Sequence, residues 1–343
     1  MTKLAIHSRK GSFSDRWIEI CESENLDYKV VDIYKVDNLS ELSDCNGFLW
    51  HWVHHEVRDI LFATSFIHTV EKMGIQVYPN LDTCWHFDDK VAQSIYLEAT
   101  RAPVAKSYIF YDKNSAKEWI KNAQWPKVFK LRRGAGATNV KLVNNSKEAL
   151  KLCNTAFGTG FNSVLKAPSI LSSQMKSVNN IDSFRKLIKK IPNGLRKHKA
   201  RKLYTNRERG YLYFQEFMPE NSFDTRITVI GDKAFAFRRK NRTNDFRASG
   251  SGIIDYDQSS IDKRCIKLAF EMSEKMGSQS MAYDFVMNQD KEPVFVEMSY
   301  AFVASAIQKC DGYYDQNLEW HPGESRVEDL VLENLLKSIE ATQ

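Results

Sequence analysis

The spacing of apolar and polar positions in the first 85 residues predicts a small open sheet of parallel strands. Short apolar runs of strand length alternate with longer stretches whose apolar residues recur every three or four positions, as in amphipathic helices. The expected strands are residues 3–7, 28–33, 47–50 and 75–78, and the expected helices are residues 13–25 and 57–73. This alternation indicates an α/β unit, and it lacks the Gly-x-Gly-x-x-Gly fingerprint of dinucleotide sites.

The rest of the chain predicts an α+β region in which hairpins dominate. One helix is expected from a cap at Asp82 or Thr83 to about Ala99, where Arg101-Ala102-Pro103 ends it. Further helices are expected at residues 115–123, 146–155, 181–191, 262–276 and 324–339, and residues 156–180 are expected to be irregular. Strands are expected at residues 104–111, 128–130, 140–143, 211–217, 226–230, 234–239, 281–287 and 293–298.

The hairpin at residues 128–143 has a basic stem and a tip of small residues. An apolar strand leads into Lys130, and the turn at residues 133–138 consists of Arg, Gly, Ala and Thr. Small residues let backbone N–H groups approach a phosphate closely, and a lysine adds a positive charge beside it. The hairpin is not a Walker P-loop, because no Gly-Lys-Ser/Thr follows. Since most glycine-containing hairpins are structural, its interpretation depends on the motifs further along the chain.

Basic charge is concentrated in one segment. The chain of 343 residues has 49 Lys/Arg and 43 Asp/Glu, and residues 185–209 hold eleven of the basic residues and one acid. The remainder, with 38 basic and 42 acidic residues, is net negative. The segment is interpreted either as a solvated face or as a border of a cleft that binds an anionic co-substrate. Nucleic acid is disfavoured, since Tyr204 is the one aromatic residue in the segment.

Composition argues against several other classes of protein. No apolar run approaches the ~18–20 residues of a membrane span, and the first residues are typical of a strand rather than of a signal peptide. The six cysteines are scattered without a Cys-x-x-Cys pair. This pattern predicts reduced thiols in a cytoplasmic protein and disfavours a zinc site.

Three histidines, His51, His54 and His55, follow the third expected strand. Ligands of open α/β sheets bind beyond the carboxyl ends of the strands, so a role facing the substrate is one interpretation. The preferred interpretation is a polar loop with capping histidines. Metal binding is least favoured, because no nearby residues complete a set of ligands.

Two carboxylates and a hydroxyl converge in the last expected hairpin. Asp284 lies on its first strand, and Glu297 and Ser299 lie two residues apart on its second strand, so that they share a face. Both carboxylates sit among apolar residues, where an ionised group requires a partner or a metal. An oxygen-rich site of this kind suits Mg²⁺, which favours carboxylates together with substrate phosphates.

The order of these features resembles the ATP-grasp superfamily, in particular the glutamate-ligase-like branch that includes enzymes adding glutamate to a ribosomal protein. The resemblance covers roughly residues 86–305. The matching pieces, in order, are Asp89-Lys90, Val128-Phe129-Lys130, Gln215-Glu216-Phe217-Met218-Pro219, Asp224-Thr225-Arg226, Ile230-Gly231-Asp232, Asn244-Asp245-Phe246-Arg247, and Asp284 with Glu297-Met298-Ser299. It implies a pre-ATP-grasp α/β domain at residues 1–85 and two ATP-grasp lobes at residues 86–212 and 213–343.

The resemblance also implies roles for individual residues. The nucleotide would be held by Lys90 and Lys130 at the phosphates, by Arg133, Gly134, Gly136 and Thr138 in the closing turn, by Glu216, Phe217 and Met218 at the adenine, and by Asp224 at the ribose. The γ-phosphate or the substrate carboxylate would meet Arg226 and Arg239, with Arg238 as the alternative to Arg239, and Asp284, Glu297 and Ser299 would hold Mg²⁺, for which Mn²⁺ can substitute.

There are departures from the family pattern. Ser299 stands where the family usually has Asn, which leaves the number of metals open, the turn is poorer in glycine than in many members, and residues 156–210 exceed the compact family core. The implied activity is ATP-dependent joining of a carboxylate to an amine through an acyl phosphate. The expected partners are an anionic carboxylate (an acidic sugar, a nucleotide-linked sugar or an acidic peptide) and a small amine or amino acid, with a homodimer left open. The alternatives are a kinase of related fold and a non-catalytic protein that binds ATP or nucleic acid.

Overall fold

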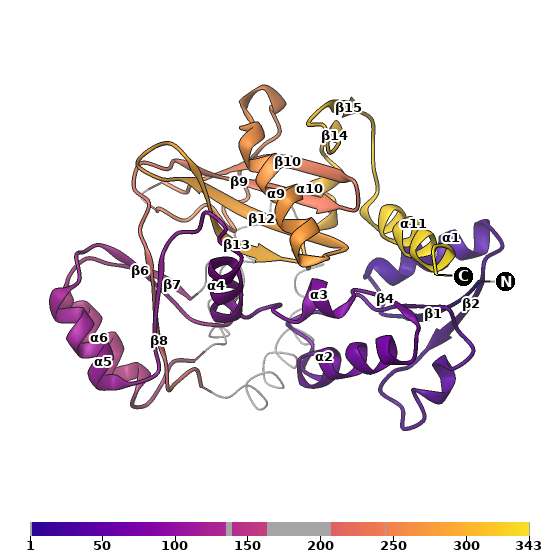
Figure 1. Cartoon of the computed structure of the whole chain (residues 1–343), viewed down its shortest axis with the longest axis horizontal. Helices are drawn as coiled ribbons and strands as arrows, with labels where there is room; N and C mark the ends of the chain where they lie inside the picture. Colours follow the sequence, from indigo (N-terminus) through magenta and orange to yellow (C-terminus); the bar gives the residue numbers. More distant parts are fainter. Residues whose placement is uncertain (1, 135–138, 163–206, 244, 343) are drawn as a thin grey trace, which may run out of the picture.

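The computed structural model describes residues 2–134, 139–162, 207–243 and 245–342, and it begins with a parallel sheet. Strands β1 (Lys3–His7), β2 (Asp27–Val31), β3 (Gly47–Leu49) and β4 (Gln76–Tyr78) lie in the order β2-β1-β3-β4. Helix α1 (Phe13–Ser23) covers one face and helix α2 (Val57–Lys72) the other, while the closing helix α11 (Val327–Glu340) lies beside α1 (Figure 1). The predicted parallel α/β unit is thus confirmed.

Alternation along β1 explains why both faces of this sheet are covered. Leu4 and Ile6 join the core with Trp17 of α1 and Leu335 of α11, whereas Ala5 faces the core that contains Ile67 of α2. The indole N–H of Trp17 also donates to the Glu328 carbonyl at 2.9 Å. The C-terminal helix therefore packs on the first sheet of the chain.

The second sheet carries the hairpin with the basic stem. Its antiparallel strands β5 (Ser107–Phe110), β6 (Lys127–Lys130), β7 (Val140–Val143) and β8 (Leu212–Glu216) lie in the order β5-β8-β6-β7. Helices α5 (Lys113–Asn122) and α6 (Ser146–Ala156) cover one face through a core that includes Ile120, Cys153, Phe129 and Phe214. The opposite face of β6 and β8 presents Lys130 and Gln215 to the rest of the molecule.

The third sheet is antiparallel and contains the predicted acidic hairpin. Its strands are β9 (Phe223–Ile230), β10 (Lys233–Lys240), β11 (Ile254–Asp255), β12 (Ser280–Met287), β13 (Pro293–Ser299), β14 (Gly312–Tyr314) and β15 (Trp320–Pro322). The order is β13-β12-β9-β10-β14-β15, with β11 paired to β10. Helix α9 (Lys263–Met276), capped by Asp262 and ended by Gly277 at a φ of 64°, packs against β9 and β12. Short elements complete the fold: the 3₁₀ turns η1 (Ser40–Leu42) and η2 (Gln258–Ser260), and helix α10 (Ala304–Ile307).

One helix prediction is wrong. The expected continuous helix between Asp82 or Thr83 and Ala99 is two helices, α3 (Leu81–Cys84) and α4 (Lys90–Ala99). Asn80 caps the first helix through the Thr83 N–H, and Asp89 caps the second. Between them, Asp88 takes a left-handed φ of 56°, which a helix cannot contain. The break places Lys90 in the first turn of a new helix, where its side chain enters a cleft.

The expected helix at residues 181–191 and most of the basic segment lie outside the described residues. Within the described ranges, no helix combines the length and the apolarity needed to span a membrane. The boundaries at residues 85 and 212 stay a prediction.

Candidate functional site

A cleft lies between the second sheet and the β12–β13 hairpin. Its cavity of about 140 Å³ is lined by β6 and β8, by the segment that joins β8 to β9, and by β12 and β13. The lining includes residues that the sequence analysis names: Val128, Lys130, Gln215, Glu216, Phe217, Met218, Asp224, Phe246, Arg247, Asp284 and Glu297. Segments far apart in the chain thus bring the predicted nucleotide and metal residues to one place.

Lys90 is buried at the start of α4 and points toward β13. Its Nζ donates to the Gly134 carbonyl at 2.6 Å and pairs with Oε1 of Glu297 at 2.9 Å. Burial by itself lowers the pKa of Lys90, but the Glu297 carboxylate outweighs it and holds the pKa above its ordinary value. Gly134 is fixed from the other side, since its N–H donates to Asp88 at 2.9 Å. The loop before α4 and the base of the hairpin tip are therefore joined through Lys90.

Lys130 ends β6 and is also buried. Its Nζ donates to Oε1 of Gln215 at 2.6 Å and to the Val296 carbonyl at 3.1 Å, both neutral acceptors. Burial is the main reason that the pKa of Lys130 falls to about 8; Lys90 acts in the same direction and Glu297 opposes it. An anion entering the cleft would restore the charged form.

Asp284 and Glu297 stand directly opposite each other across the β12–β13 hairpin. The register pairs Asp284 with Glu297 and then Phe285 with Phe295, so Val296 is the extra residue of a bulge. Burial raises the pKa of each carboxyl, yet the neighbouring cations dominate: Arg226 and Arg239 hold the pKa of Asp284 well below its usual range, and Lys90 and Lys130 lower that of Glu297. Both groups are therefore ionised at neutral pH.

Two arginines, from β9 and β10, form hydrogen bonds with the buried Asp284. Arg226 binds it with two hydrogen bonds, Nε to Oδ1 at 2.7 Å and Nη2 to Oδ2 at 2.8 Å. Arg239 adds a third, from Nη2 to Oδ2 at 2.7 Å. Arg239, rather than its neighbour Arg238, is the one that joins this cluster, because Arg238 pairs with Asp255 at 2.6 Å.

Asp224, the residue predicted at the ribose, makes both of its carboxylate contacts with Arg239. The two distances are 2.7 Å to Nε and 2.6 Å to Nη2, and the side chain is buried. Burial first, and the charge of Asp284 second, raise the pKa of Asp224 to about 6. The ribose role stays a prediction, since Asp224 lines the cleft while it orients Arg239.

The donor set on the hairpin fits a divalent cation that prefers oxygen. Each carboxylate oxygen has two lone pairs. On Asp284, the three arginine N–H groups leave one lone pair of Oδ1 free. On Glu297, Lys90 takes one of the four carboxylate lone pairs. Ser299 donates its hydroxyl proton to the Ala301 carbonyl at 3.2 Å, which keeps its oxygen lone pairs available. Asp284, Glu297 and Ser299 are consequently compatible with Mg²⁺.

The segment predicted to hold adenine leaves β8 at the edge of the cleft. Glu216, its first residue, pairs with Lys127 of β6 at 2.9 Å and accepts from the Tyr108 hydroxyl at 3.3 Å. Phe217 and Met218 line the cavity, and the Phe217 ring meets Phe246 edge to face with centroids 5.7 Å apart. An apolar slot beside a polar strand end is suited to a planar base.

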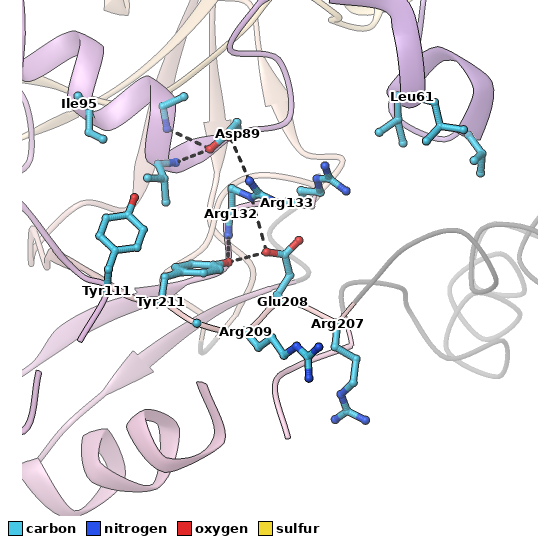
Figure 2. A pocket seen from close by; sticks show the side chains of 15 residues that line it. Leu61, Asp89, Ile95, Tyr111, Arg132, Arg133, Arg207, Glu208, Arg209 and Tyr211 are labelled. Atoms are coloured by element: carbon cyan, nitrogen blue, oxygen red, sulfur yellow. Dashed lines mark hydrogen bonds and ion pairs between the residues drawn. The ribbon is translucent and has the colours of Figure 1, made fainter. Parts of the chain in front are cut away.

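Three residues predicted in the closing turn are not placed in the cleft. Gly136 and Thr138 lie outside the described residues. Arg133 lines a second and larger cavity on the other side of the Asp89 loop, together with Arg132, Arg207, Glu208 and Arg209 (Figure 2). Of the two described residues of the predicted turn, Arg133 and Gly134, it is Gly134 that contacts the Lys90 side chain.

Sequence reasoning missed Gln215 and Lys127 as functional residues. Gln215 fixes the Lys130 ammonium, and Lys127 neutralises Glu216. The available signal was that each is a polar residue in an otherwise apolar strand: Gln215 follows Leu212-Tyr213-Phe214, and Lys127 precedes Val128-Phe129. Such residues are buried only with partners.

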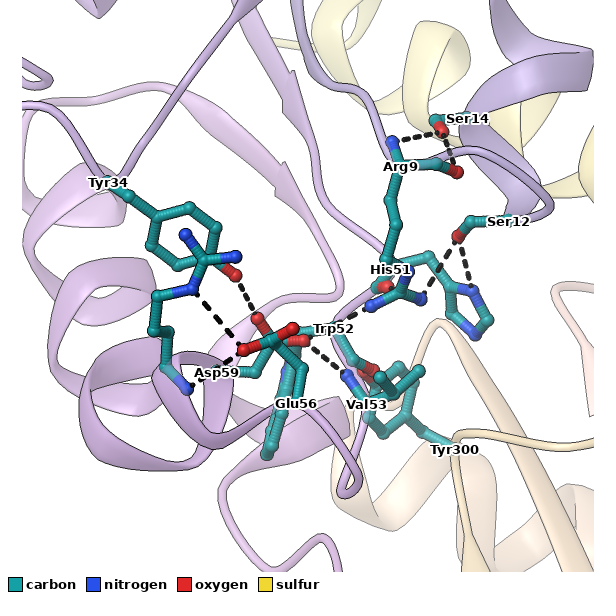
Figure 3. A network of polar contacts seen from close by, with 11 residues as sticks. Arg9, Ser12, Ser14, Tyr34, His51, Trp52, Val53, Glu56, Asp59 and Tyr300 are labelled. Atoms are coloured by element: carbon teal, nitrogen blue, oxygen red, sulfur yellow. Dashed lines mark hydrogen bonds and ion pairs between the residues drawn. The ribbon is translucent and has the colours of Figure 1, made fainter. Parts of the chain in front are cut away.

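His51 lies in a polar network at the carboxyl ends of the parallel strands (Figure 3). Its Nδ1 is 3.1 Å from the Ser12 hydroxyl, and its ring stacks on Phe13 with centroids 3.9 Å apart. Burial, followed by the charge of Arg9, lowers the pKa of His51 to about 3, so it is neutral. These contacts agree with a structural role for His51, and a substrate-facing role for the loop stays a hypothesis.

The same network connects the first sheet to the end of β13. Arg9 donates to the His51 carbonyl at 2.7 Å and pairs with the buried Asp59 at 3.2 Å. Tyr300, next to Ser299, donates its hydroxyl to the Trp52 carbonyl (Figure 3). The loop after β3 therefore lies beside the strand end that carries the expected metal ligand.

A separate group of potential metal ligands lies on the β14–β15 hairpin. Asp315, Glu319 and His321 place one ligand atom each within 4.8 Å of the others. Asp315 already accepts from His321 at 2.9 Å and from the backbone N–H of Glu319 at 2.9 Å. These contacts account for the cluster as the polar structure of a tight hairpin.

Comparisons with known proteins agree with this geometry. Residues 195–313 match the RimK-like ATP-grasp domain. The alpha-aminoadipate–LysW ligase LysX of Saccharolobus solfataricus is 23% identical over 286 residues, which are 80% of this chain and 86% of that protein.

Among solved structures, the RimK domain ATP-grasp protein of Sphaerobacter thermophilus has a TM-score of 0.56 and 14% identity, over 98% of this chain and 100% of that one. The D-alanine–D-alanine ligase of Bacillus anthracis, complexed with ATP, has a TM-score of 0.57 and 10% identity, over 100% of this chain and 99% of that one. The predicted fold class and resemblance are confirmed: the chain has the fold shared by these ATP-grasp structures, and its residues 195–313 resemble the RimK-like ATP-grasp domain.

Proposed function

We propose that the protein uses MgATP to join a specific carboxylate to an amine through an acyl phosphate. A carboxylate oxygen attacks the γ-phosphorus, the bond from that phosphorus to the bridging oxygen breaks, and ADP leaves with the electron pair. The amine then attacks the acyl carbon, phosphate leaves, and the amine loses a proton. The products are an amide, ADP and phosphate.

The observation that carries the proposal is the charge pattern of the cleft. Three cations, Lys90, Arg226 and Arg239, pair with the carboxylates of Glu297, Asp284 and Asp224, and a fourth cation, Lys130, lies beside them on neutral acceptors. The cluster carries one net positive charge, and most of its side chains are buried. Such a site is suited to a polyanion whose charge changes during phosphoryl transfer.

The positions of the side chains support the following roles. Lys90 and Lys130 bind and orient phosphate oxygens, while Arg226 and Arg239 fix Asp284 in its ionised form. Mg²⁺ held by Asp284 and Glu297 would neutralise part of the phosphate charge. No protein nucleophile is required, because the substrate carboxylate is the attacking group.

The two co-substrates are proposed from chemistry and from the relatives. The carboxylate partner is anionic, in keeping with the basic surroundings, and the amine partner is a small amine or amino acid. The relative from Saccharolobus solfataricus is named for alpha-aminoadipate and LysW, an amino acid and a second partner. The cytoplasm, which supplies ATP, is the proposed location.

Trapping the acyl phosphate tests the proposal. The protein is incubated with MgATP, a panel of carboxylates and hydroxylamine in place of the amine, and the products are read by mass spectrometry. A hydroxamate that depends on both ATP and carboxylate is expected. A phosphorylated hydroxyl compound would favour the kinase, and ATP binding without turnover on any carboxylate panel would favour the non-catalytic alternative.

A further inference from the structure

A second cavity, of about 710 Å³, lies behind the loop that carries Lys90. It is lined by helices α2 and α4, by the stem of the basic hairpin and by the segment that leads into β8. It shares neither Lys130 nor either hairpin carboxylate with the ATP cleft.

One side of this cavity is cationic, with four arginines against two acids (Figure 2). Arg132 serves both acids, since Asp89 is 3.8 Å from its Nη1 and Glu208 is 3.7 Å from its Nε. Glu208 is 4% exposed and also accepts from the Tyr211 hydroxyl at 2.9 Å. Both carboxylates thus have partners within the cavity wall, and the positive charge of the other arginines is left in excess.

Two of those arginines have no neutralising partner among the residues that the structure describes. Within the described ranges, Arg133 and Arg209 form no ion pair with a carboxylate. Arg207 donates to a neutral acceptor, the Gly160 carbonyl, at 2.7 Å. Three guanidinium groups around one cavity are a site for an anionic head group, because guanidinium binds carboxylate and phosphate oxygens in pairs.

Aliphatic side chains border the arginines on two sides. Leu61 of α2 and Ile95 of α4 are 67% and 52% exposed, and Figure 2 shows them on opposite sides of Asp89 and Arg133. Val57 and Ile60 belong to the α2 side, and Val91 belongs to the α4 side. Sugar hydroxyls would find no partners there, whereas a hydrocarbon body would remove these side chains from water.

Within the described ranges, no carboxylate forms an ion pair with Arg133, Arg207 or Arg209. By composition, residues 163–206, which precede Arg207, contain eleven Lys/Arg and one acid, Asp182. We therefore expect a ligand to supply the anion that matches the arginines.

We propose that this cavity is a second ligand site, separate from the ATP cleft, for an anion with an aliphatic body and a carboxylate or phosphate head. The head lies among Arg133, Arg207 and Arg209, and the body lies along Leu61, Val57 and Ile60 of α2. The proposal goes beyond the ligase activity and does not depend on it.

Calorimetry on the full chain with octyl phosphate, octanoate, inorganic phosphate and octanol tests the site. We expect an octyl anion to bind at least about tenfold more tightly than inorganic phosphate, which the burial of about two methylenes supplies, and octanol not to bind. The phosphate and carboxylate arms identify the preferred head. Saturation with a non-hydrolysable ATP analogue is expected to leave this binding in place.

Two surface variants and a control decide the location. Arg209→Gln and Leu61→Asp are each expected to weaken octyl-anion binding about tenfold, by loss of a charged contact and of the apolar wall. Arg326→Gln, at an exposed position before α11, is expected to change nothing. Displacement by the ATP analogue, equal affinity for inorganic phosphate, or unchanged binding in both cavity variants would overturn the proposal.

Discussion

Replacing Lys130 should change how nucleotide binding depends on pH. In the free protein, burial lowers the pKa of Lys130 to about 8 because its ammonium meets neutral acceptors, Gln215 and the Val296 carbonyl. A triphosphate in the cleft supplies negative charge and should raise that pKa again. Binding of nucleotide should therefore be accompanied by uptake of a proton at Lys130.

The magnitude follows from the position of the pKa. At pH 8 about half of the free protein carries a neutral Lys130, so binding should take up about 0.5 proton at this group. At pH 9 about nine-tenths is neutral, and the dissociation constant should be roughly tenfold higher than at pH 7, or about 1.4 kcal/mol. Below pH 7 the lysine is already charged and contributes no uptake.

Calorimetry with Mg²⁺ and a non-hydrolysable ATP analogue, in two buffers of different ionisation enthalpy, measures this uptake. Lys130→Met should abolish the uptake near pH 8 and weaken binding at pH 7. Lys141→Met is the matched control, since this lysine lies on the next strand with a side chain that is 58% exposed. The reasoning is refuted if the Lys130→Met protein takes up the same proton as wild type, or if wild type takes up none.

Four further predictions concern the carboxylates and Ser299. Glu297→Gln should reduce kcat far more than nucleotide affinity, measured by phosphate release and calorimetry; full activity at limiting Mg²⁺ would show that Glu297 is not a ligand. Ser299→Asn should be tolerated or should lower the Mg²⁺ concentration needed for turnover, and a severe loss would assign Ser299 another role. Asp284→Asn should lower the free energy of unfolding in urea by about 3–5 kcal/mol at pH 7, because Arg226 and Arg239 lose a buried charged partner. Since the folded state has a depressed pKa for Asp284, this stabilisation is present above about pH 4 and is lost as the pH falls through the lower folded pKa. Equal stability of the two proteins at pH 7 would contradict this. Asp224→Asn should lower kcat without altering the discrimination between ATP and 2′-deoxy-ATP if Asp224 acts through Arg239, whereas loss of that discrimination would support the ribose contact.

Periodicity recovered most of the longer elements because each has a local signal, whereas the short elements β11, β14, β15 and α10 were not predicted. The alternation in β1 and the apolar spacing in α2 and α9 are readable in single segments, and Gly277 marks the end of α9. The break between α3 and α4 was missed because an aspartate such as Asp89 can lie within a helix or cap the start of a new one, and the sequence alone did not distinguish the two. The left-handed turn at Asp88 depends on its contact with Gly134, 46 residues further along the chain.

The site could be predicted as a set of residues but not as a network. The resemblance brought Lys90, Asp284 and Glu297 to one cleft, and the structure agrees that they converge. It could not show that Asp224 holds Arg239, because that contact is set by the register of β9 and β10. The second cavity, lined by Arg132, Arg133, Arg207 and Arg209 and here called the arginine cavity, likewise combines α2, α4 and the segment before β8, which no local sequence pattern connects.

The most direct test of the account is a crystal structure of the protein with Mg²⁺ and a non-hydrolysable ATP analogue. The account predicts adenine beside Glu216, Phe217 and Met218, phosphate oxygens within hydrogen-bond distance of Lys90 and Lys130, and metal on Asp284 and Glu297. A nucleotide bound in the arginine cavity, or one whose phosphates contact neither lysine, would contradict it.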